Sequence, residues 1–291
     1  MFYPLLYLFW IGWNKYNSKF PFPLVKATRR LEEDDKVVIC FHDWLGYPGG
    51  RKKRLTEKLS FDCGRSRVIR ELAACENKMP SEVIVSLSGN GELEFDERMA
   101  QKIIRSSNLG LDFGGYNAML QEVRKMDGNP FVILMNSSLA GGFYDGWLDD
   151  YCGILKDDRT IGLLGISTRA RYPGLLRNHY VPHLQSFFLL STKEVLEFIL
   201  DRNRGVLPGA REKNKYRLIQ KGEIGISKQI LREGYGLAVV YKGVIYKFRL
   251  KNRFGNLIDE WPFPVGDIRY SDSDSESINS LSKLGCRGKK S

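Results

Sequence analysis

The stretch Asn108-Leu-Gly-Leu-Asp-Phe-Gly-Gly-Tyr116 and the later run Phe131-Val-Ile-Leu-Met-Asn-Ser-Ser138 decide the fold that this sequence predicts. The first places three glycines and an aspartate directly before a helical pattern at residues 117–125. A glycine-rich turn that opens a helix presents backbone N–H groups that suit phosphate. The second is an apolar run that ends in small polar side chains, which in an open α/β sheet lie in the ligand-binding crevice. Together they predict a nucleotide or nucleotide-sugar pocket.

Short apolar runs and amphipathic stretches alternate along the chain, which predicts a mostly parallel α/β sheet flanked by helices. Strands are expected at residues 36–41, 83–87, 131–135, 161–166, 186–190 and 237–241. Helices are expected at residues 65–77, 95–105, 117–125, 193–201 and 223–233. Residues 202–217 are polar and basic and contain glycine and proline, so we interpret them as a mobile surface loop.

The composition indicates one domain with flanking segments of different character. A chain of 291 residues that is 43% hydrophobic can bury one substantial core. We expect this domain at residues 36–269, after an apolar N-terminal segment and linker at residues 1–35. Residues 270–291 are rich in Ser, Asp and Lys, which predicts a disordered polar tail.

The N-terminal segment Met1–Trp13 is apolar and aromatic and has no charged side chain. A helix needs about 20 residues to cross a bilayer, so this segment is too short to span one comfortably. It fits a truncated signal anchor, an interfacial helix or a strand packed on the domain. We expect peripheral membrane contact through residues 1–13, which places the protein on the cytoplasmic face of a membrane or otherwise associated with one. A secretory-pathway anchor is the alternative.

The net charge of +11 predicts a strongly positive face. Such a face suits phosphate-bearing small molecules, an anionic membrane or nucleic acid, and it is also compatible with a merely basic solvated surface. Against nucleic acid, the chain shows no interleaving of aromatic and basic residues and no helix-turn-helix or zinc-finger pattern, although Arg51–Arg54 are basic. The five cysteines are scattered without a C-x-x-C pair, which argues against zinc.

Four blocks of the sequence, in this order, resemble the rhamnan synthesis protein F family. They are Asp112–Tyr116, Leu134–Ser138, His183–Leu189 and Glu223–Ser227, and the likeness extends over residues 36–240. Members of that family are glycosyltransferases that build cell-surface polysaccharide. The resemblance implies a GT-A fold, which is the Rossmann-like fold of nucleotide-diphospho-sugar transferases. It also implies a nucleotide-sugar donor and a glycan or polysaccharide acceptor.

The place of the metal-binding motif departs from what GT-A enzymes usually have there. An Asp-x-Asp that holds Mg²⁺ or Mn²⁺ is expected at the end of a central strand, but the resemblance aligns Asn136, Ser137 and Ser138 with it. Neutral oxygens are poorer ligands than carboxylates for these ions, so metal dependence is in doubt. If a metal binds, Asp112 and Asn136 are its ligands. Otherwise cationic side chains replace it, unless they are only solvated surface charge; the candidates are Arg169, Arg171, Arg177, Lys213 and Lys215.

The resemblance implies three catalytic residues: Glu223, Asp112 and His183. Glu223 would act as the base that deprotonates the acceptor hydroxyl, although an acidic residue in a first helical turn is also favoured by the helix dipole. Asp112 would bind sugar or ribose hydroxyls, or else satisfy the amides at the start of its helix. His183 alternates with Gln185, so both face one side of a strand, which would be the acceptor pocket. The alternative for His183 is a purely structural role.

The remaining site residues are assigned to the donor and the acceptor. Ser186 joins Gln185 on the acceptor side. The donor site is expected to comprise Asn108, Gly110, Gly114, Gly115, Tyr116, Asn136, Ser137, Ser138, His42, Asp43, Ser88 and Asn90. Within that set the glycines allow close backbone approach, and Asn108 holds their turn. His42, Asp43, Ser88 and Asn90 end the first two strands and would lie near the nucleotide base.

The sequence therefore favours a glycosyltransferase that uses a nucleotide-activated sugar. The alternative is a non-catalytic relative that binds a sugar or nucleotide, with the same fold and without the metal carboxylates.

Overall fold

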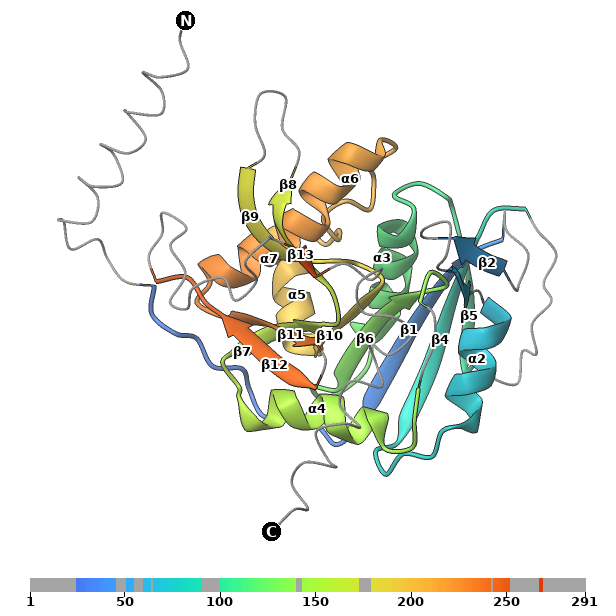
Figure 1. The fold of residues 1–291 in the computed structure, drawn as a ribbon, viewed down its shortest axis with the longest axis horizontal. Helices are drawn as coiled ribbons and strands as arrows, with labels where there is room; N and C mark the ends of the chain where they lie inside the picture. The colour runs from blue at the N-terminus through green and yellow to red at the C-terminus, as the bar shows by residue number, and fades with distance from the viewer. Residues whose placement is uncertain are drawn as a thin grey trace, which may run out of the picture.

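The computed structural model describes residues 25–45, 51–54, 60–63, 65–90, 100–139, 143–172, 179–241, 243–251 and 267–268. Within these residues, eight strands form one sheet in the order β12-β11-β7-β10-β6-β1-β4-β5 (Figure 1). Its strands are β1 (Val37–Trp44), β4 (Ser81–Ser88), β5 (Lys102–Ser106), β6 (Phe131–Asn136), β7 (Ile161–Gly165), β10 (Phe188–Thr192), β11 (Gly236–Tyr241) and β12 (Val244–Phe248). Two smaller sheets comprise β2 (Arg51–Arg54) with β3 (Ser60–Cys63), and β8 (Thr168–Tyr172) with β9 (His179–Leu184) and β13 (Asp267–Ile268).

The large sheet is mixed and mostly parallel. β1 pairs in parallel with β4 and β6, β4 with β5, and β7 with β11. β10 lies antiparallel between β6 and β7, and β12 is an antiparallel edge strand. The expected α/β sheet is therefore confirmed as a class, and its arrangement is compatible with a Rossmann-like fold.

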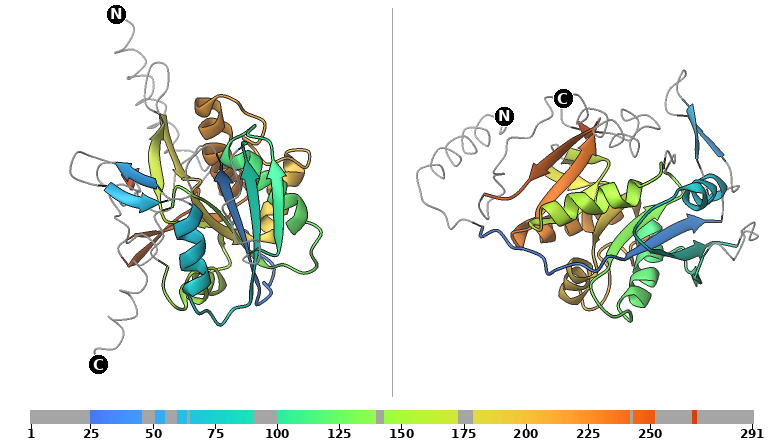
Figure 2. Two further views of the ribbon diagram at one scale, coloured as in Figure 1. Left: turned by 90° about the vertical axis from the view of Figure 1, so that its right-hand side faces the viewer. Right: turned by 90° about the horizontal axis from the view of Figure 1, so that it is seen from below.

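Helices cover both faces of the sheet, as the views in Figure 2 show. The helices are α2 (Arg65–Ala74), α3 (Asp112–Val123), α4 (Trp147–Asp157), α5 (Lys193–Arg202), α6 (Lys215–Lys221) and α7 (Glu223–Arg232). On one face α2 and α4 enclose a core that contains Phe41, Phe131 and Trp147. On the other face α3, α5 and α7 enclose a core that contains Phe113, Tyr116 and Ile230. Because β1 and β6 are buried on both faces, their sequences are continuous apolar runs rather than alternating ones.

One sequence-based expectation was wrong, and the loop expected at residues 202–217 is confirmed only in part, since residues 203–214 contain no helix or strand. Within the helix expected at residues 95–105, the part that the structure describes contains β5, an edge strand. Ile103 and Ile104 are half-buried there, whereas Lys102 and Arg105 are exposed, and charged side chains are tolerated at a sheet edge. The expected surface loop at residues 202–217 is anchored by buried Leu207, and its last residues belong to α6.

The segment at residues 25–35, expected to be part of a linker, is a strap packed along the domain. Val25 N donates to Lys251 O at 3.2 Å, and Thr28 N donates to Gly234 O at 3.1 Å. Arg30 is buried; its guanidinium donates to the carbonyl oxygens of Ile161, at 2.6 Å, and Leu155, and pairs with Glu33. The strap therefore supplies the hydrogen-bond partners of carbonyl groups on β7 and α4.

The predictions for residues 1–13 and 270–291 lie outside the described residues. In the part of the chain that the structure describes, none of the helices combines the length and the apolar character needed to cross a bilayer.

Gly115 sets how closely α3 approaches β1. A Cβ atom at this position would lie 2.0 Å from His42 Nδ1 and 2.5 Å from His42 Cγ, and the His42 ring is itself buried. We expect Gly115→Ala to lower the free energy of unfolding by about 1–3 kcal/mol, the usual cost of overpacking. The matched control is Gly153→Ala in α4, where an added Cβ meets nothing within 4 Å.

The control is expected to raise the free energy of unfolding by up to about 1 kcal/mol through helix propensity. Urea denaturation of the two variants and the wild type measures both effects. Equal stability of the two variants would show that the helix is not held against His42.

Candidate functional site

Polar side chains gather at one edge of the sheet, where β1, β4 and β6 have their carboxyl ends. Asn136 ends β6 and pairs in register with His42 of β1, and Ser88 ends β4. Because β10 runs antiparallel to β6, the residues just before it lie at this same edge; Asn136 N donates to Phe187 O at 3.3 Å. Ser186 therefore joins the group, although it is distant in sequence.

Asp112 and Asn136 form a hydrogen-bonded pair within the site. Asn136 Nδ2 donates to Asp112 Oδ2 at 2.8 Å, and Asn136 Oδ1 accepts from Ser138 N at 2.9 Å. Asp112 is the first residue of α3 and follows Leu111, which has φ of 47° and ψ of −127°. A non-glycine residue in such a conformation costs about 1–3 kcal/mol, and strain of this kind clusters at functional sites.

Tyr116 links that pair to Glu223. Its buried hydroxyl donates to Ser186 O at 2.7 Å. Ser186 in turn donates to Glu223 Oε1 twice, from its backbone N at 3.0 Å and from its Oγ at 2.9 Å. Burial raises the pKa of Tyr116 well above its usual value, and the negative charges of Asp112 and Glu223 add to the effect. Both carboxylates are therefore within electrostatic range of one phenol.

Glu223 is a half-buried carboxylate at the start of α7. Burial raises its pKa above the ordinary value of 4.5, against the two Ser186 hydrogen bonds and the positive charges of Arg169 and Lys215, which lower it. A helix start favours an acidic residue in any protein, but the contacts with Ser186 are specific to this fold. The arrangement creates a carboxylate that is held in place and has a raised proton affinity.

His42 supports the site from beneath. Its ring is buried under Gly115 and packs edge-on against Tyr116, with 6.4 Å between ring centroids. Its Nε2 lies 3.5 Å from Ser88 Oγ, which donates to Asn108 Oδ1 at 3.4 Å. Burial lowers the pKa of His42 to about 4, so the ring is neutral at physiological pH. The ring is therefore a packing element of the site rather than an exposed contact for a nucleotide base.

Asp43 forms a buried ion pair that the sequence did not reveal. Arg65 NH1, at the start of α2, lies 2.6 Å from Asp43 Oδ2, and both side chains are no more than 5% exposed. The two residues are 22 positions apart, and no motif connects them. Breaking such a pair leaves a buried charge, so its role in this structure is to hold α2 against the end of β1. By contrast, Asn90 is exposed beyond the end of β4.

The glycine-rich turn does not offer the free amide groups that were expected for phosphate. Gly110 N donates to Glu212 O at 3.2 Å, and Gly114 N and Gly115 N donate to Leu111 O at 3.1 and 3.3 Å. The glycines serve close packing instead: a Cβ on Gly110 would lie 2.2 Å from Ala210 O, and one on Gly114 would lie 1.9 Å from Leu109 O. Binding of the sugar donor by these three glycines remains a prediction, and their amide groups do not support it because they already have hydrogen-bond partners.

His183 and Gln185 lie beside the site on the β8–β9 ribbon and the segment that follows it. His183 is buried and pairs in register with Arg169 of β8. Gln185 Oε1 accepts from Ser167 Oγ at 2.5 Å, and Gln185 N donates to Ser167 O at 3.1 Å. These hydrogen bonds hold the β8–β9 ribbon next to Ser186 and Glu223.

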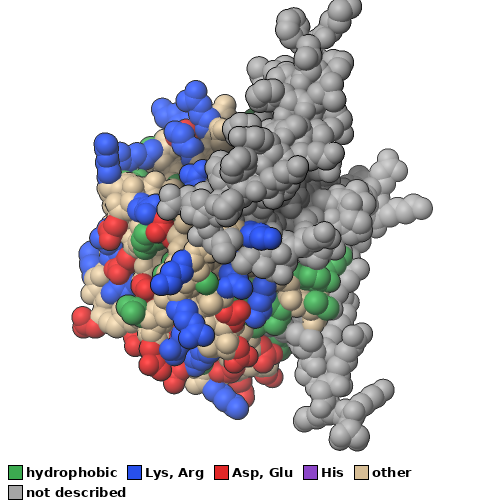
Figure 3. Space-filling model, turned by 90° about the vertical axis from the view of Figure 1, so that its left-hand side faces the viewer, with side chains coloured by type: hydrophobic (Ala, Val, Ile, Leu, Met, Phe, Trp, Pro, Cys, Tyr) green, Lys and Arg blue, Asp and Glu red, His purple; other side chains and the backbone are tan. Residues whose placement is uncertain are grey.

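Among the candidate cations whose side chains the structure describes, two have an electrostatic effect at the site. The charges of Arg169 and Lys215 act on Glu223, as described above. Lys213 is exposed, and the side chains of Arg171 and Arg177 lie outside the described residues. On the side of the molecule in Figure 3, Lys and Arg are interspersed with Asp and Glu rather than gathered in one continuous patch.

The donor atoms at this edge do not fit the expected divalent metal site. Asn136 turns its Nδ2 toward Asp112 and commits its Oδ1 to Ser138 N, so its oxygen is not directed at an ion shared with Asp112. Within the described residues, no group of three or more His, Cys, Asp or Glu side chains is placed to hold a metal ion. Hard divalent cations prefer carboxylate oxygens, and of the two expected ligands Asp112 and Asn136 only Asp112 supplies a carboxylate.

No family model and no curated protein matches the sequence. The structure brings Asp112, Tyr116, Asn136, Ser186 and Glu223 into one chain of contacts.

The raised pKa of Glu223 makes stability depend on pH. Between 4.5 and the folded pKa, the folded state holds more protons than the unfolded state, so stability falls as pH rises through this window. Glu223→Gln cannot ionise, and its amide oxygen can still accept both bonds from Ser186. We expect the melting temperature of the variant, minus that of the wild type, to increase as pH rises from 4.5. Calorimetric scans across pH measure this difference, and a flat or decreasing difference would contradict the assignment.

Proposed function

We propose that this protein is a glycosyltransferase that moves a sugar from a nucleotide-sugar donor to a hydroxyl group of a glycan or polysaccharide acceptor. The observation that carries the proposal is the convergence of Glu223, held by Ser186, with the Asp112–Asn136 pair at the carboxyl edge of the sheet. Ligands of open α/β sheets bind at this edge. The four sequence blocks that resemble the rhamnan synthesis protein F family supply these same residues.

In this proposal Glu223 is the base. Ser186 occupies its Oε1 with two hydrogen bonds, so Oε2 takes the proton of the acceptor hydroxyl. As that proton leaves, the acceptor oxygen forms a bond to the anomeric carbon. The bond from this carbon to the diphosphate breaks, and its electron pair departs with the nucleoside diphosphate. A carboxylate of raised pKa is a stronger base than an ordinary one, which favours this step.

The other residues bind and orient the substrates. Asp112 and Asn136 would accept and donate hydrogen bonds to sugar or ribose hydroxyls. Arg169 and Lys215, whose charges act on Glu223, would stabilise the negative charge that develops on the diphosphate. Because the donor atoms do not fit a metal ion, no step is assigned to one. Peripheral contact of residues 1–13 with a membrane would bring the enzyme near a surface-bound acceptor.

A second candidate function is supported by the neutral residues at the metal-motif position. Asn136, Ser137 and Ser138 stand where a carboxylate pair is usual, and Asn136 is already bonded to Asp112 and Ser138. This favours a non-catalytic protein that binds a nucleotide sugar. The two functions differ in turnover, since the binding protein would retain the donor unchanged.

A panel of nucleotide sugars tests the proposed activity. Each donor is incubated with the protein in Mn²⁺ and in EDTA, and release of nucleoside diphosphate and donor affinity are both measured. We expect turnover of one donor to persist in EDTA, because cationic side chains rather than a metal stabilise the leaving group. Binding without turnover would support the non-catalytic alternative, and absence of binding to every donor would contradict both.

Glu223→Gln tests the base. We expect kcat to fall about 10²- to 10⁴-fold, the usual contribution of a positioned general base, while the donor Kd is unchanged. The matched control is Glu82→Gln at the amino end of β4, where Glu82 pairs with Lys36 at the opposite edge of the sheet. The control should leave kcat unchanged. Transfer by Glu223→Gln at the wild-type rate would remove Glu223 from the mechanism.

A further inference from the structure

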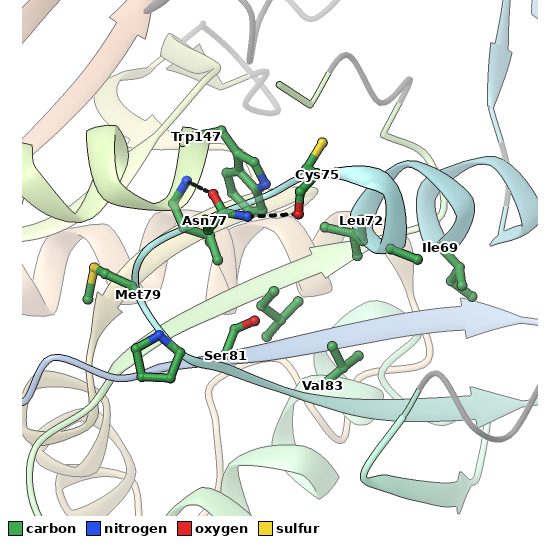
Figure 4. Close-up of a pocket in the computed structure, with 12 residues that line it drawn as sticks. Ile69, Leu72, Cys75, Asn77, Met79, Ser81, Val83 and Trp147 are labelled. Carbon is green, nitrogen blue, oxygen red and sulfur yellow. Dashed lines mark hydrogen bonds between the residues drawn. The ribbon is translucent and has the colours of Figure 1, made fainter. Parts of the chain in front are cut away.

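A cavity of about 490 Å³ lies between α2, α4 and the strands β1 and β4 (Figure 4). Apolar side chains form most of its wall, among them Ile39, Ile69, Leu72, Met79 and Val83. Its volume lies in the usual range of small-molecule sites and is roughly three times that of a cavity that holds benzene. The cavity is on the sheet face opposite α7 and reaches the amino end of β4. It is therefore separate from the candidate site at the carboxyl edge.

Trp147 provides a polar atom in the wall of this cavity. The residue is fully buried, and its indole Nε1 has no hydrogen-bond partner among the described residues. Figure 4 shows the nitrogen on the side of the ring that faces Cys75 and Asn77. Asn77 is already committed, since its Oδ1 accepts from Leu148 N at 3.0 Å and its Nδ2 donates to Cys75 O at 3.4 Å. A buried N–H group without a partner is unfavourable, so an acceptor beside it would stabilise the fold.

Carboxylates lie near the cavity, although the exposed side chain of Lys78 is also nearby. Asp149 accepts from the backbone N of Lys78 and Met79 at 2.9 and 3.0 Å, and Asp145 accepts from Glu76 N at 3.0 Å. Burial raises the pKa of Cys75, and the charges of Asp145 and Glu71 raise it further. The potential that disfavours a thiolate at Cys75 also disfavours an anionic ligand.

We propose that this cavity binds a small, neutral, apolar molecule whose hydroxyl, ether or carbonyl oxygen accepts a hydrogen bond from Trp147 Nε1. The apolar wall buries the hydrocarbon part, which supplies most of the affinity. The indole N–H fixes the orientation of the polar end and requires a hydrogen-bond acceptor there, and the nearby carboxylates select against an anionic head group. The proposal does not depend on the proposed transferase activity.

The test uses 1-octanol and octanoate, two probes with the same chain length and different head-group charge. The full chain is labelled with ¹⁵N at its indole nitrogens, and the spectrum contains a signal for each of the five tryptophans. Trp147→Phe identifies the signal of Trp147 by its loss. We expect octanol to shift this signal in a saturable way and octanoate to bind at least tenfold more weakly.

Two substitutions in α2 distinguish octanol binding in the cavity from octanol binding on the helix surface. Ala73→Trp places a large side chain in the cavity wall, and the matched control Ala74→Trp places the same side chain on exposed α2 surface outside it. Octanol binding, followed by calorimetry, is expected to be lost in Ala73→Trp and retained in Ala74→Trp. Trp147→Phe keeps an aromatic side chain and removes the indole N–H donor, so the affinity should fall about three- to tenfold.

Three results would overturn the proposal. The first is no saturable shift of the Trp147 signal with octanol. The second is equal binding by the Ala73→Trp and Ala74→Trp variants, provided that both melt cooperatively. The third is octanoate binding as tight as octanol binding, which would contradict the proposed selection against an anionic head group. Should Ala73→Trp not fold, an unchanged octanol affinity in Trp147→Phe would overturn the assigned hydrogen bond by itself.

Discussion

The close approach of α3 to β1 at Gly115 is the constraint on which the candidate site depends. Only a residue without a Cβ lets the helix lie directly on the His42 ring. That position brings Asp112, at the helix start, within hydrogen-bond distance of Asn136, and brings Tyr116 to the carbonyl of Ser186. Two polar contacts of α3, one with β6 and one with the segment before β10, therefore follow from one packing distance. The neutral state of buried His42 is part of the same arrangement, since burial disfavours the charged ring there.

The helices and strands that the sequence predicted well are those whose own pattern of apolar residues identifies them. β1 and β6 are apolar on both faces, and α5 and α7 have one apolar side, so burial alone identifies them. β5 was mistaken for a helix because an edge strand of five residues with two adjacent apolar and two basic side chains has no clear period. The antiparallel direction of β10 could not be foreseen, since pairing depends on how the chain returns to the sheet. Helix α4 was overlooked although Trp147, Tyr151 and Leu155 recur at helical spacing.

The site shows the same division between local and tertiary information. Residues at strand ends, such as Asn136 and Ser88, were identified because the change from apolar to polar residues at the end of a strand can be recognised in the sequence alone. The residues that contact these side chains in the folded protein could not be recognised from the sequence. The ion pair of Asp43 with Arg65 joins positions that share no motif. The amide groups of the glycine-rich turn were expected to face a ligand, but their partners lie in the turn itself and at Glu212, which the chain reaches only about a hundred residues later.

The strap at residues 25–35 has a consequence for the order in which the fold forms. Its hydrogen bonds reach Gly234 and Lys251, and the side-chain bond from Thr28 to Glu233 O spans 205 positions. During synthesis, Val25 and Thr28 therefore have no partner until residues 233–251 have been made. Contacts of such high sequence separation slow folding, because the loop between them must close first. Arg30 can pair sooner, because its partners Ile161 and Leu155 lie earlier in the chain, so the first residues of the strap are the last part of it to be fixed.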